Sequence, residues 1–177
     1  MNAPTVRIVD RIDDVVLEGL VDVLVDCVEG GASVSFMHPL SRERAADFWR
    51  DVAAGVASGA RVLAVAEDEE GLCGTVQLVL AQPDNQAHRA DLAKMLVMRR
   101  ARRHGTGAAL MRAAEDAARR HGKTLLVLDT ASAEAERLYE RAGWIRVGTI
   151  PDYALLPQGG HCDTTLFYRR LAADGTA

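Results

Sequence analysis

The chain has 177 residues, a length typical of one globular domain, and 49% of them are hydrophobic, which is enough for a sizeable core. Its formal net charge at pH 7 is -4. Proteins that bind nucleic acid or anionic membranes make those contacts largely through surplus Lys and Arg, so this balance argues against both partners. The composition favours a single domain, residues 1–177, that acts on a small molecule.

The cysteines and the apolar segments bear on location. Cys27, Cys73 and Cys162 are far apart and form no C-x-x-C pair, and an odd number of cysteines makes a poor disulfide framework. We therefore expect a reducing, cytoplasmic environment. The first residues lack the pattern of an export signal, and no segment reaches the roughly 18 apolar residues of a membrane span. We expect a protein that is neither exported nor inserted in a membrane.

Hydrophobic periodicity predicts the elements of the N-terminal half. Alternating apolar residues indicate strands, and apolar residues every three or four positions indicate helices with one buried face. Ser41 is a suitable N-cap for the second helix, and the acidic turn 68–71 between two β-rich runs predicts an antiparallel hairpin. In chain order these elements are a strand at 6–9, a helix at 15–28, a helix from 41 to about 58, and strands at 61–67 and 72–80.

The C-terminal half begins with a strand, helix, strand unit. On its helix we expect Glu115 and Asp116 to face solvent, in ion pairs with Arg119 and Arg120, and Gly122 to end the helix. The expected elements are a strand at 90–98, a helix at 107–121, a strand at 124–129, a helix through 135–142, and strands at 144–150 and 164–170 around a loop at 155–163.

The order of these elements predicts the fold class. A strand, helix, strand unit makes the strands at 90–98 and 124–129 parallel, with a right-handed crossover, whereas the hairpin before them is antiparallel. The sheet must therefore be mixed. We expect an α/β fold (an α+β mixed sheet) with about seven strands flanked by four helices.

Two glycines, Gly105 and Gly107, lie between the strand at 90–98 and the start of the next helix. Unpaired backbone N–H groups and about half a unit of positive dipole charge converge at such a helix start. Glycine lets an anion approach these amides closely, and neighbouring arginines add positive field. The residues therefore predict a cradle for a phosphate group. The arginines are Arg99, Arg100, Arg102 and Arg103.

Other interpretations of the glycines are weaker. A dinucleotide-binding fold also places Gly105, Gly107 and a later acidic residue, Asp129, around a helix, but its third glycine is Leu110 here. The arginines could contact nucleic acid, yet in an acidic protein such a group more often clamps a phosphate or faces solvent. The histidines have no chelating spacing, so no metal is expected, and no Ser or Cys has a nucleophile setting.

Residues 97–107 resemble the acetyl-CoA motif of the Gcn5-related N-acetyltransferases (GNAT), Q/R-x-x-G-x-G/A, placed five residues after a strand valine. Residues 135–144 are similar to a second segment of that family, A-x-x-L-Y-x-x-x-G-F/W. Two motifs in this order, with one helix and one strand between them, are more specific than either alone. The element order matches too, so the resemblance covers nearly the whole chain.

The resemblance implies that acetyl-CoA is the cosubstrate and indicates which residues hold it. Ser132 lies where many members have an asparagine that touches the pantetheine arm, and this difference leaves its role as a ligand open. The other implied contacts are backbone groups of Met95, Leu96 and Val97 and the loop residues Arg102, Arg103, His104, Gly105, Thr106, Gly107 and Ala108.

Direct acetyl transfer needs a base for the ammonium proton. Asp91 matches the catalytic carboxylate position of several members, and a pantetheine arm that runs back along the strand from Val97 would end near it, roughly 20 Å away at about 3.3 Å per residue. Direct contact or a bridging water would both serve. Asp129 is a second candidate, or else a helix cap. Asp91 could instead be a surface charge paired with Arg89 or Lys94.

Transfer also needs an acid for the departing thiolate. Tyr139 matches the tyrosine that often supplies this proton in the family. It also falls on the apolar face of its helix, so a packing role is the alternative.

Residues 30–37, 94–97 and 128–130 resemble the tabtoxin-resistance type of acetyltransferase, which implies a small amino-acid-like toxin or antibiotic as acceptor. Segments 30–39 and 155–163 are expected to shape the acceptor pocket. The predicted function is direct transfer of acetyl from acetyl-CoA to a primary amine of a small molecule. The alternatives are a non-catalytic CoA-binding or sensing domain and a protein N-acetyltransferase. Monomer and homodimer both remain open.

Overall fold

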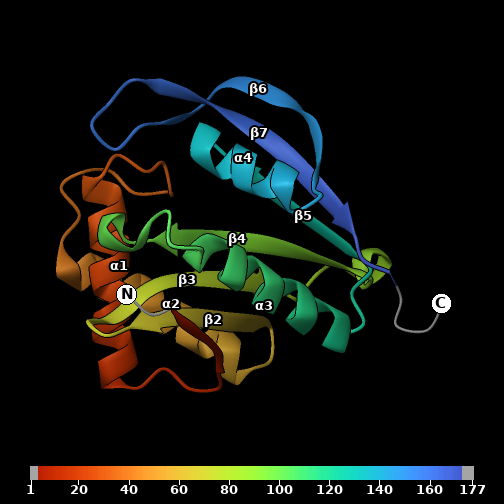
Figure 1. The fold of residues 1–177 in the computed structure, drawn as a ribbon, viewed down its shortest axis with the longest axis horizontal. Coiled ribbons are helices and arrows are strands. Elements are labelled where there is room, and N and C mark those ends of the chain that lie inside the picture. The colour runs from red at the N-terminus through yellow and green to blue at the C-terminus, as the bar shows by residue number, and fades with distance from the viewer. Residues whose placement is uncertain (1–3, 173–177) are drawn as a thin grey trace.

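A seven-stranded mixed sheet runs through the computed structural model, which describes residues 4–172 (Figure 1). Its strand order is β1-β2-β3-β4-β5-β7-β6. The strands are β1 (Thr5–Val9), β2 (Arg61–Asp68), β3 (Gly71–Val79), β4 (Arg89–Val97), β5 (Leu125–Thr130), β6 (Ile145–Leu155) and β7 (His161–Arg170). The helices are α1 (Asp14–Glu29), α2 (Arg42–Ala57), α3 (Thr106–Arg120) and α4 (Ala133–Arg141), with short 3-10 turns η1 (Asp84–Gln86) and η2 (Arg99–Ala101).

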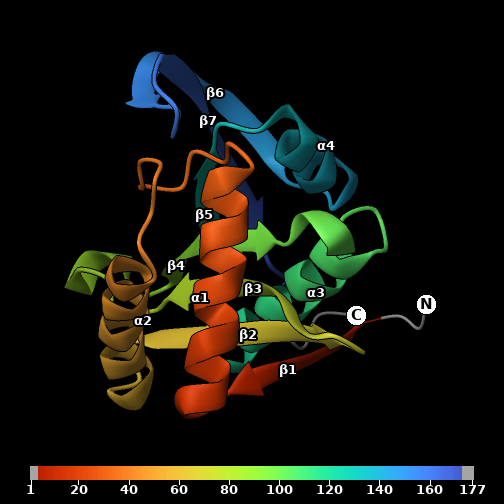
Figure 2. The ribbon, with the colours of Figure 1, turned by 90° about the vertical axis from the view of Figure 1, so that its left-hand side faces the viewer.

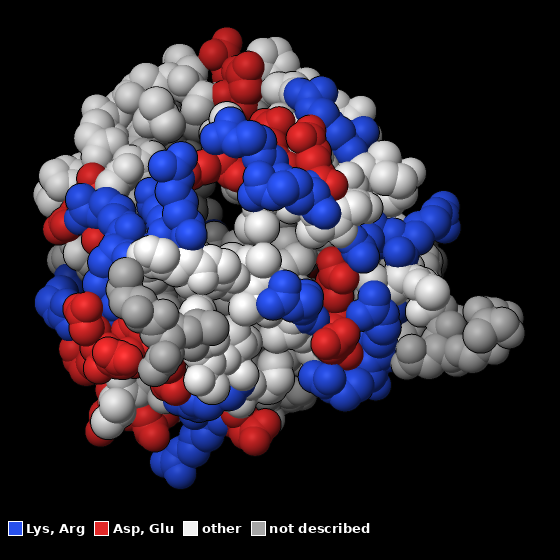
Figure 3. Space-filling view, in the orientation of Figure 1, with Lys and Arg blue, Asp and Glu red and all other residues white. Residues whose placement is uncertain are grey.

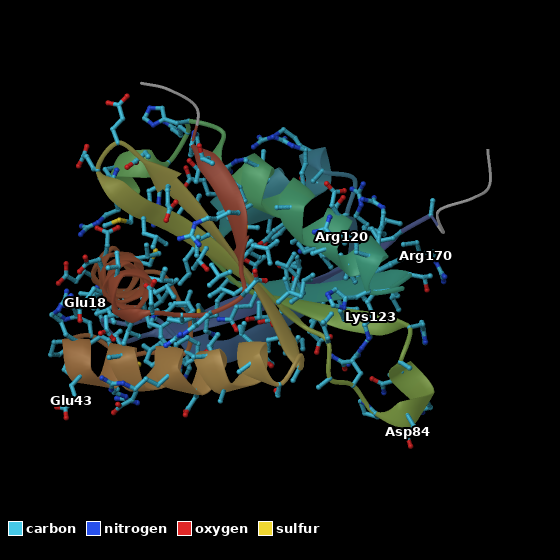
Figure 4. The ribbon with its side chains drawn as sticks, turned by 90° about the horizontal axis from the view of Figure 1, so that it is seen from below. Glu18, Glu43, Asp84, Arg120, Lys123 and Arg170 are labelled. Carbon is cyan, nitrogen blue, oxygen red and sulfur yellow. The ribbon has the colours of Figure 1, made fainter. Side chains whose placement is uncertain are left out.

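Helices cover both faces of the sheet. Figures 2 and 4 show α2 on the side opposite α3, and α1 lies beside α2. Because side chains alternate along a strand, Leu63 and Val65 of β2 enter the core under α1 and α2, whereas Ala64 and Ala66 enter the core under α3. The first core centres on Trp49, which is fully buried. Among the described residues, no helix is both long and apolar enough to cross a membrane.

The pairing of the strands confirms the predicted mixed α/β sheet with four helices. β4 and β5 are parallel, and the neighbouring pairs are antiparallel. The parallel ladder is short, because it runs only from Arg89 opposite Leu125 to Asp91 opposite Val127. Beyond Asp91 the two strands have no common ladder, which leaves one edge of β4 without a strand partner.

The end of the chain differs from the sequence prediction. Residues 155 and 161–163, expected in a loop, belong to β6 and β7, and β6 also contains residues 151–154, so only a short turn remains between the strands. Pro151 and Asp152 lie in a register irregularity of β6, and Asp152 has a φ of 51°. Because β6 is an edge strand, it tolerates a proline that can donate no ladder hydrogen bond.

The expectation that Glu115 faces solvent is wrong. Its side chain is only 8% exposed, and its Oε1 accepts a hydrogen bond from Trp144 Nε1 at 3.3 Å and lies 3.2 Å from Arg169 Nε. The helix period alone could not predict this, because Trp144 and Arg169 reach α3 from sequence-distant positions. Its neighbour Asp116 does face solvent and pairs with Arg119 at 2.9 Å, where Arg120 was expected.

We predict that Glu115→Ala destabilises the fold by about 3 kcal/mol, because it leaves the half-buried Arg169 guanidinium and the Trp144 N–H without their acceptor. Chemical denaturation of the variant measures this loss. Asp116→Ala is the matched control on the next residue of α3, and we expect its effect to stay within about 0.5 kcal/mol. Equal effects of the two substitutions would contradict the buried network.

Candidate active site

The gap between β4 and β5 is produced by an irregularity in β4. Thr75 of β3 pairs with Leu96, but Gln77 pairs with Ala93, so β4 carries one extra residue across this stretch. Lys94 absorbs the extra length with a φ of 50°. A bulge of this kind bends its strand, and here it coincides with the end of the β4 and β5 ladder. The sheet therefore opens at residues 93–97 of β4.

The N-terminus of α3 lies at this opening and has free backbone donors. Its N-cap is Gly105, with a φ of 82° and no capping side chain, whereas Asp13, Ser41 and Ser132 cap the other three helices. A Cβ at Gly105 would have no atom within 4 Å, so the loop is open there. The first amides of any α-helix lack intrahelical acceptors. These are the donors that a phosphate group needs.

The surface around this helix start is basic. Figure 3 shows Lys and Arg side chains around a hollow on the face that carries α3 and α4. However, two of the four arginines expected to strengthen the cradle are occupied elsewhere. Arg99 Nε is 2.8 Å from Asp26 Oδ1, and Arg100 forms an ion pair with Asp68. Their charges are largely neutralised by these carboxylates.

The other two arginines remain at the cradle. Arg102 Nε donates to the Val97 carbonyl at 3.1 Å, which ties the loop to the end of β4. Arg103 is 86% exposed and lies 3.8 Å from Glu134 at the start of α4. His104, next in the loop, is exposed as well. The positive field therefore comes from the helix amides, Arg102 and Arg103.

The remaining residues implied to hold the cofactor lie on β4 and in the first turn of α3. Met95 and Leu96 lie on β4 at the opening, with β3 on their other side. The Thr106 hydroxyl is buried and donates to the Ala101 carbonyl at 3.0 Å, so only the amide of Thr106 can serve a ligand. Gly107 and Ala108 follow in the first turn of α3. A Cβ at Gly107 would lie 3.0 Å from Leu138 of α4, so glycine also permits the close approach of the two helices.

The Ser132 hydroxyl accepts a hydrogen bond from the Ala135 amide at 3.3 Å and caps α4. Its own amide donates to Thr130 Oγ1 at 3.2 Å. The sequence alternative was a cap formed by Asp129 together with Thr130 and Ser132, and the structure shows the cap at Ser132, supported by Thr130.

The two candidate carboxylates lie in one pocket. Asp91 and Asp129 both line a cavity of about 640 Å³ on the α2 side of the sheet. Asp91 Oδ1 is 3.5 Å from Arg89 Nη2 and has no hydrogen-bond partner among the described residues, and its side chain is 39% exposed. The sequence left open whether Asp91 pairs with Arg89. The structure shows this ion pair, but no hydrogen bond between the two side chains.

Tyr139 is a buried titratable group that packs against Phe167, one of the residues that line this pocket. Its ring packs between Trp144 and Phe167, with centroid distances of 5.9 and 5.8 Å. Burial raises the pKa of Tyr139 far above its usual value, and the negative charge of Asp129 raises it further. The Tyr139 phenol is therefore protonated at neutral pH, and it is close enough to Asp129 to feel its charge.

The pocket contains residues that the sequence reasoning did not select. Lys94 Nζ donates to Ser35 Oγ at 3.0 Å and lies 5.7 Å from the centre of the Phe48 ring. Burial and the nearby Arg61 lower the pKa of Lys94, whereas the charge of Asp129 opposes this shift. Gln77 adds a fully buried amide to the floor. Polar residues inside the apolar runs of β3 and β4 were the available signal.

The segments 30–39 and 155–163 meet beside the pocket. Ser33 Oγ donates to the Leu155 carbonyl at 3.2 Å, and the His38 amide donates to the Pro157 carbonyl at 2.9 Å. The first segment reaches the pocket side chains through the hydrogen bond of Ser35 with Lys94 and the ring contact of Phe36 with Phe48. Within residues 4–172, no group of three or more His, Cys, Asp or Glu residues could hold a metal ion.

Comparison with known proteins identifies the family. Residues 25–144 match the model of the acetyltransferase (GNAT) family. An uncharacterized N-acetyltransferase in the hisH-hisA intergenic region of Azospirillum brasilense is 31% identical over 136 residues, which are 76% of this chain and 79% of that protein. The chain therefore belongs to the GNAT family of acetyl-CoA-dependent N-acetyltransferases.

Solved structures confirm the fold. A phosphinothricin acetyltransferase from Sinorhizobium meliloti, in complex with acetyl-CoA, has a TM-score of 0.80 and 18% identity over 97% of this chain and 90% of that one. The yncA protein of Salmonella typhimurium, a putative acetyltransferase with its cofactor acetyl-CoA, has a TM-score of 0.78 and 19% sequence identity. The match covers 99% of this chain and 98% of that one. A ribosomal-protein-alanine N-acetyltransferase from Brucella melitensis has a TM-score of 0.79 and 19% sequence identity. The match covers 94% of this chain and 99% of that one. These three relatives do not single out the tabtoxin-resistance type.

We predict that Gly105→Val abolishes measurable acetyl-CoA binding in a calorimetric titration. A β-branched residue is strained at a φ of 82°, and its side chain would occupy the open side of the loop. Gly59→Val is the matched control, because Gly59 has a φ of 75° and equally open surroundings but lies in the turn after α2. Both variants should lose similar stability. Normal affinity in Gly105→Val would remove the cradle assignment.

Proposed function

We propose that this enzyme transfers acetyl directly from acetyl-CoA to a primary amine of a small molecule. The observation that carries the proposal is the placement of the groups: a helix start with free donors and a pocket with two carboxylates lie at the same opening of the sheet. A non-catalytic CoA-binding domain would need only the first of these. The pocket favours catalysis over that alternative.

The residues present fit acetyl-CoA. The amides of Gly105, Thr106, Gly107 and Ala108 would hold the diphosphate, with Arg102 and Arg103 beside them. The free edge of β4 at Met95 and Leu96 would hold the pantetheine arm by backbone hydrogen bonds. The Val97 carbonyl is already shared with Arg102, so Val97 would contribute through its amide. When bound, acetyl-CoA supplies an acetyl group activated as a thioester.

Two proton transfers fall to this chain. An amine is a nucleophile only after losing its ammonium proton, and we assign that proton to the carboxylate of Asp91, directly or through a water, with Asp129 as the other candidate. The departing thiolate takes a proton from a donor. We assign this role to the Tyr139 hydroxyl, because Tyr139 matches the tyrosine that often supplies this proton in the family and a phenol is protonated at neutral pH. Packing of the ring alone is the competing role of Tyr139.

The acceptor is proposed to be amino-acid-like, a toxin or antibiotic of that type, on the resemblance of the chain to tabtoxin-resistance acetyltransferases. The pocket supports a small acceptor, because it holds about 640 Å³ and is bordered by segment 30–39 through Ser35. A protein N-terminus is the alternative acceptor. A cytoplasmic location is supported by the three cysteines, Cys27, Cys73 and Cys162, which are all free.

The proposed function is tested with a panel of amines, acetyl-CoA and a readout for free CoA thiol. The panel contains free amino acids, simple alkylamines and short peptides with free N-termini. We expect amine-dependent thiol release with at least one small amine. Release only with peptides would indicate a protein N-acetyltransferase. Tight acetyl-CoA binding without release for any amine would indicate the non-catalytic alternative.

The proton-transfer roles predict losses of rate without losses of cofactor binding. In Asp91→Ala and Tyr139→Phe we expect kcat to fall by about 10²- to 10⁴-fold, because each variant lacks one proton-transfer group. Acetyl-CoA affinity and melting temperature should stay near the wild-type values in both variants. Undiminished turnover of Asp91→Ala would move the base to Asp129. Undiminished turnover of Tyr139→Phe would leave Tyr139 with a packing role.

A further inference from the structure

The floor of the pocket has a regular arrangement across the sheet. One row of side chains on the α2 side crosses four strand boundaries: Arg61, Val79, Asp91, Val127 and Tyr168 are paired in that order. The adjacent row contains Gln77 and Ala93, then the opening of the sheet, and then Asp129 opposite Leu166. In these two rows Arg61 and Gln77 lie on β2 and β3, and the carboxylates Asp91 and Asp129 lie on β4 and β5.

Gln77 carries an unused hydrogen-bond donor in this floor. Its side chain is 0% exposed, and its Oε1 accepts a hydrogen bond from Arg61 Nη1 at 2.9 Å. Because Oε1 accepts this hydrogen bond, the other end of the amide, Nε2, faces away from Arg61. Its Nε2 has no partner within residues 4–172. A buried donor without an acceptor destabilises the protein, so a ligand acceptor at this place would recover that cost.

Arg61 is held in position by packing as well as by Gln77. Gly55 of α2 leaves room for its side chain, since a Cβ there would lie 2.7 Å from Arg61 Cδ. Lys94 lines the same pocket and is held at its wall by Ser35. Arg61 and Lys94 repel each other closely enough that Arg61 contributes to the lowered pKa of Lys94. Two cations that share a pocket favour an anion between them.

The third cation in the pocket, Arg89, contacts a glutamine and the carboxylate of the proposed base. Arg89 donates to Gln82 Oε1 at 2.6 Å and lies against Asp91. It therefore offsets the charge of the proposed base. The other two cations of the pocket are Arg61, which contacts the neutral Gln77, and Lys94, whose charge Asp129 partly offsets.

We propose that Gln77 Nε2, Arg61 and Lys94 form a subsite for the carboxylate of the acceptor. The inference rests on the proposed function and names its substrate class: the acceptor is an amino acid, or an amino-acid-like molecule, whose amine points to the opening between β4 and β5. Strands lie about 4.8 Å apart, so Gln77 on β3 is one strand away from the edge of β4 that borders the opening. That span suits a small molecule with an amine and a carboxylate.

The test compares amino acids with their carboxamides, for example L-methionine with L-methioninamide and L-alanine with L-alaninamide. The amide removes the negative charge and keeps the amine. Amino-acid amides have the less basic amine, so more of it is unprotonated at neutral pH, and this bias runs against the proposal. We expect the wild-type kcat/KM to favour the acid by about 10- to 100-fold, mainly through KM, as for a hydrogen-bonded charge.

Gln77→Glu is the most informative variant. It keeps the shape of the side chain and an acceptor for Arg61, but it replaces the free donor with an acceptor. The preference for the acid should vanish or reverse. Gln82→Glu is the matched control, because Gln82 makes an equivalent contact with Arg89 but does not line the pocket. In Gln82→Glu the preference for the acid over the amide should persist. Arg61→Gln is the second variant if Gln77→Glu folds poorly, and its preference should fall as well.

Two outcomes would overturn the subsite: equal use of acid and amide by the wild type, or a preference that survives in Gln77→Glu and Arg61→Gln. If no amine is acetylated, the proposed function fails, and the subsite is judged separately by calorimetric titration of acid and amide into the CoA-bound protein. Tighter binding of the acid that is lost in Gln77→Glu would support the subsite. Equal binding of acid and amide would reject it.

Discussion

The parting of β4 and β5 is the feature on which the rest of the site depends. Their ladder ends at Asp91, and the extra residue in β4, accommodated by the positive φ of Lys94, coincides with that end. Backbone groups at an open strand edge must find partners in solvent or in a ligand. The opening therefore provides a strand edge on β4 that an extended molecule can pair with.

The two faces contribute different chemistry at this opening. On the α3 side, the uncapped helix start and Gly105 supply backbone donors for a phosphate group. On the α2 side, the pocket carries side-chain charges. An acetyl donor bound on one side and an amine bound on the other can meet only where the sheet is open. The proposed cofactor residues accordingly form a compact motif, whereas the residues that line the pocket come from six strands and α2.

Charge pairing decides which of the many ionisable groups remain available. Arg99 and Arg100 lie in the motif region but are bound to Asp26 and Asp68. Glu115, on a helix that looks amphipathic in the sequence, is buried against Trp144. In the pocket, by contrast, Gln77 and Asp91 keep polar atoms that have no hydrogen-bond partner among residues 4–172. Unsatisfied buried groups are costly to stability, and their concentration here is typical of a site that a ligand completes.

The sequence by itself determined the family and the mixed α/β fold, because periodicity, element order and the motif at residues 102–107 are local patterns along the chain. The same local patterns identified Asp91, Asp129 and Tyr139 as candidates. Only the tertiary structure decided what surrounds them. Gln77, Arg61 and Lys94 come together through strand register and a bulge, and such pairings between distant residues leave no periodic trace in the sequence. The long β6 was missed for a related reason, since an edge strand can accept Pro151 where an interior strand could not.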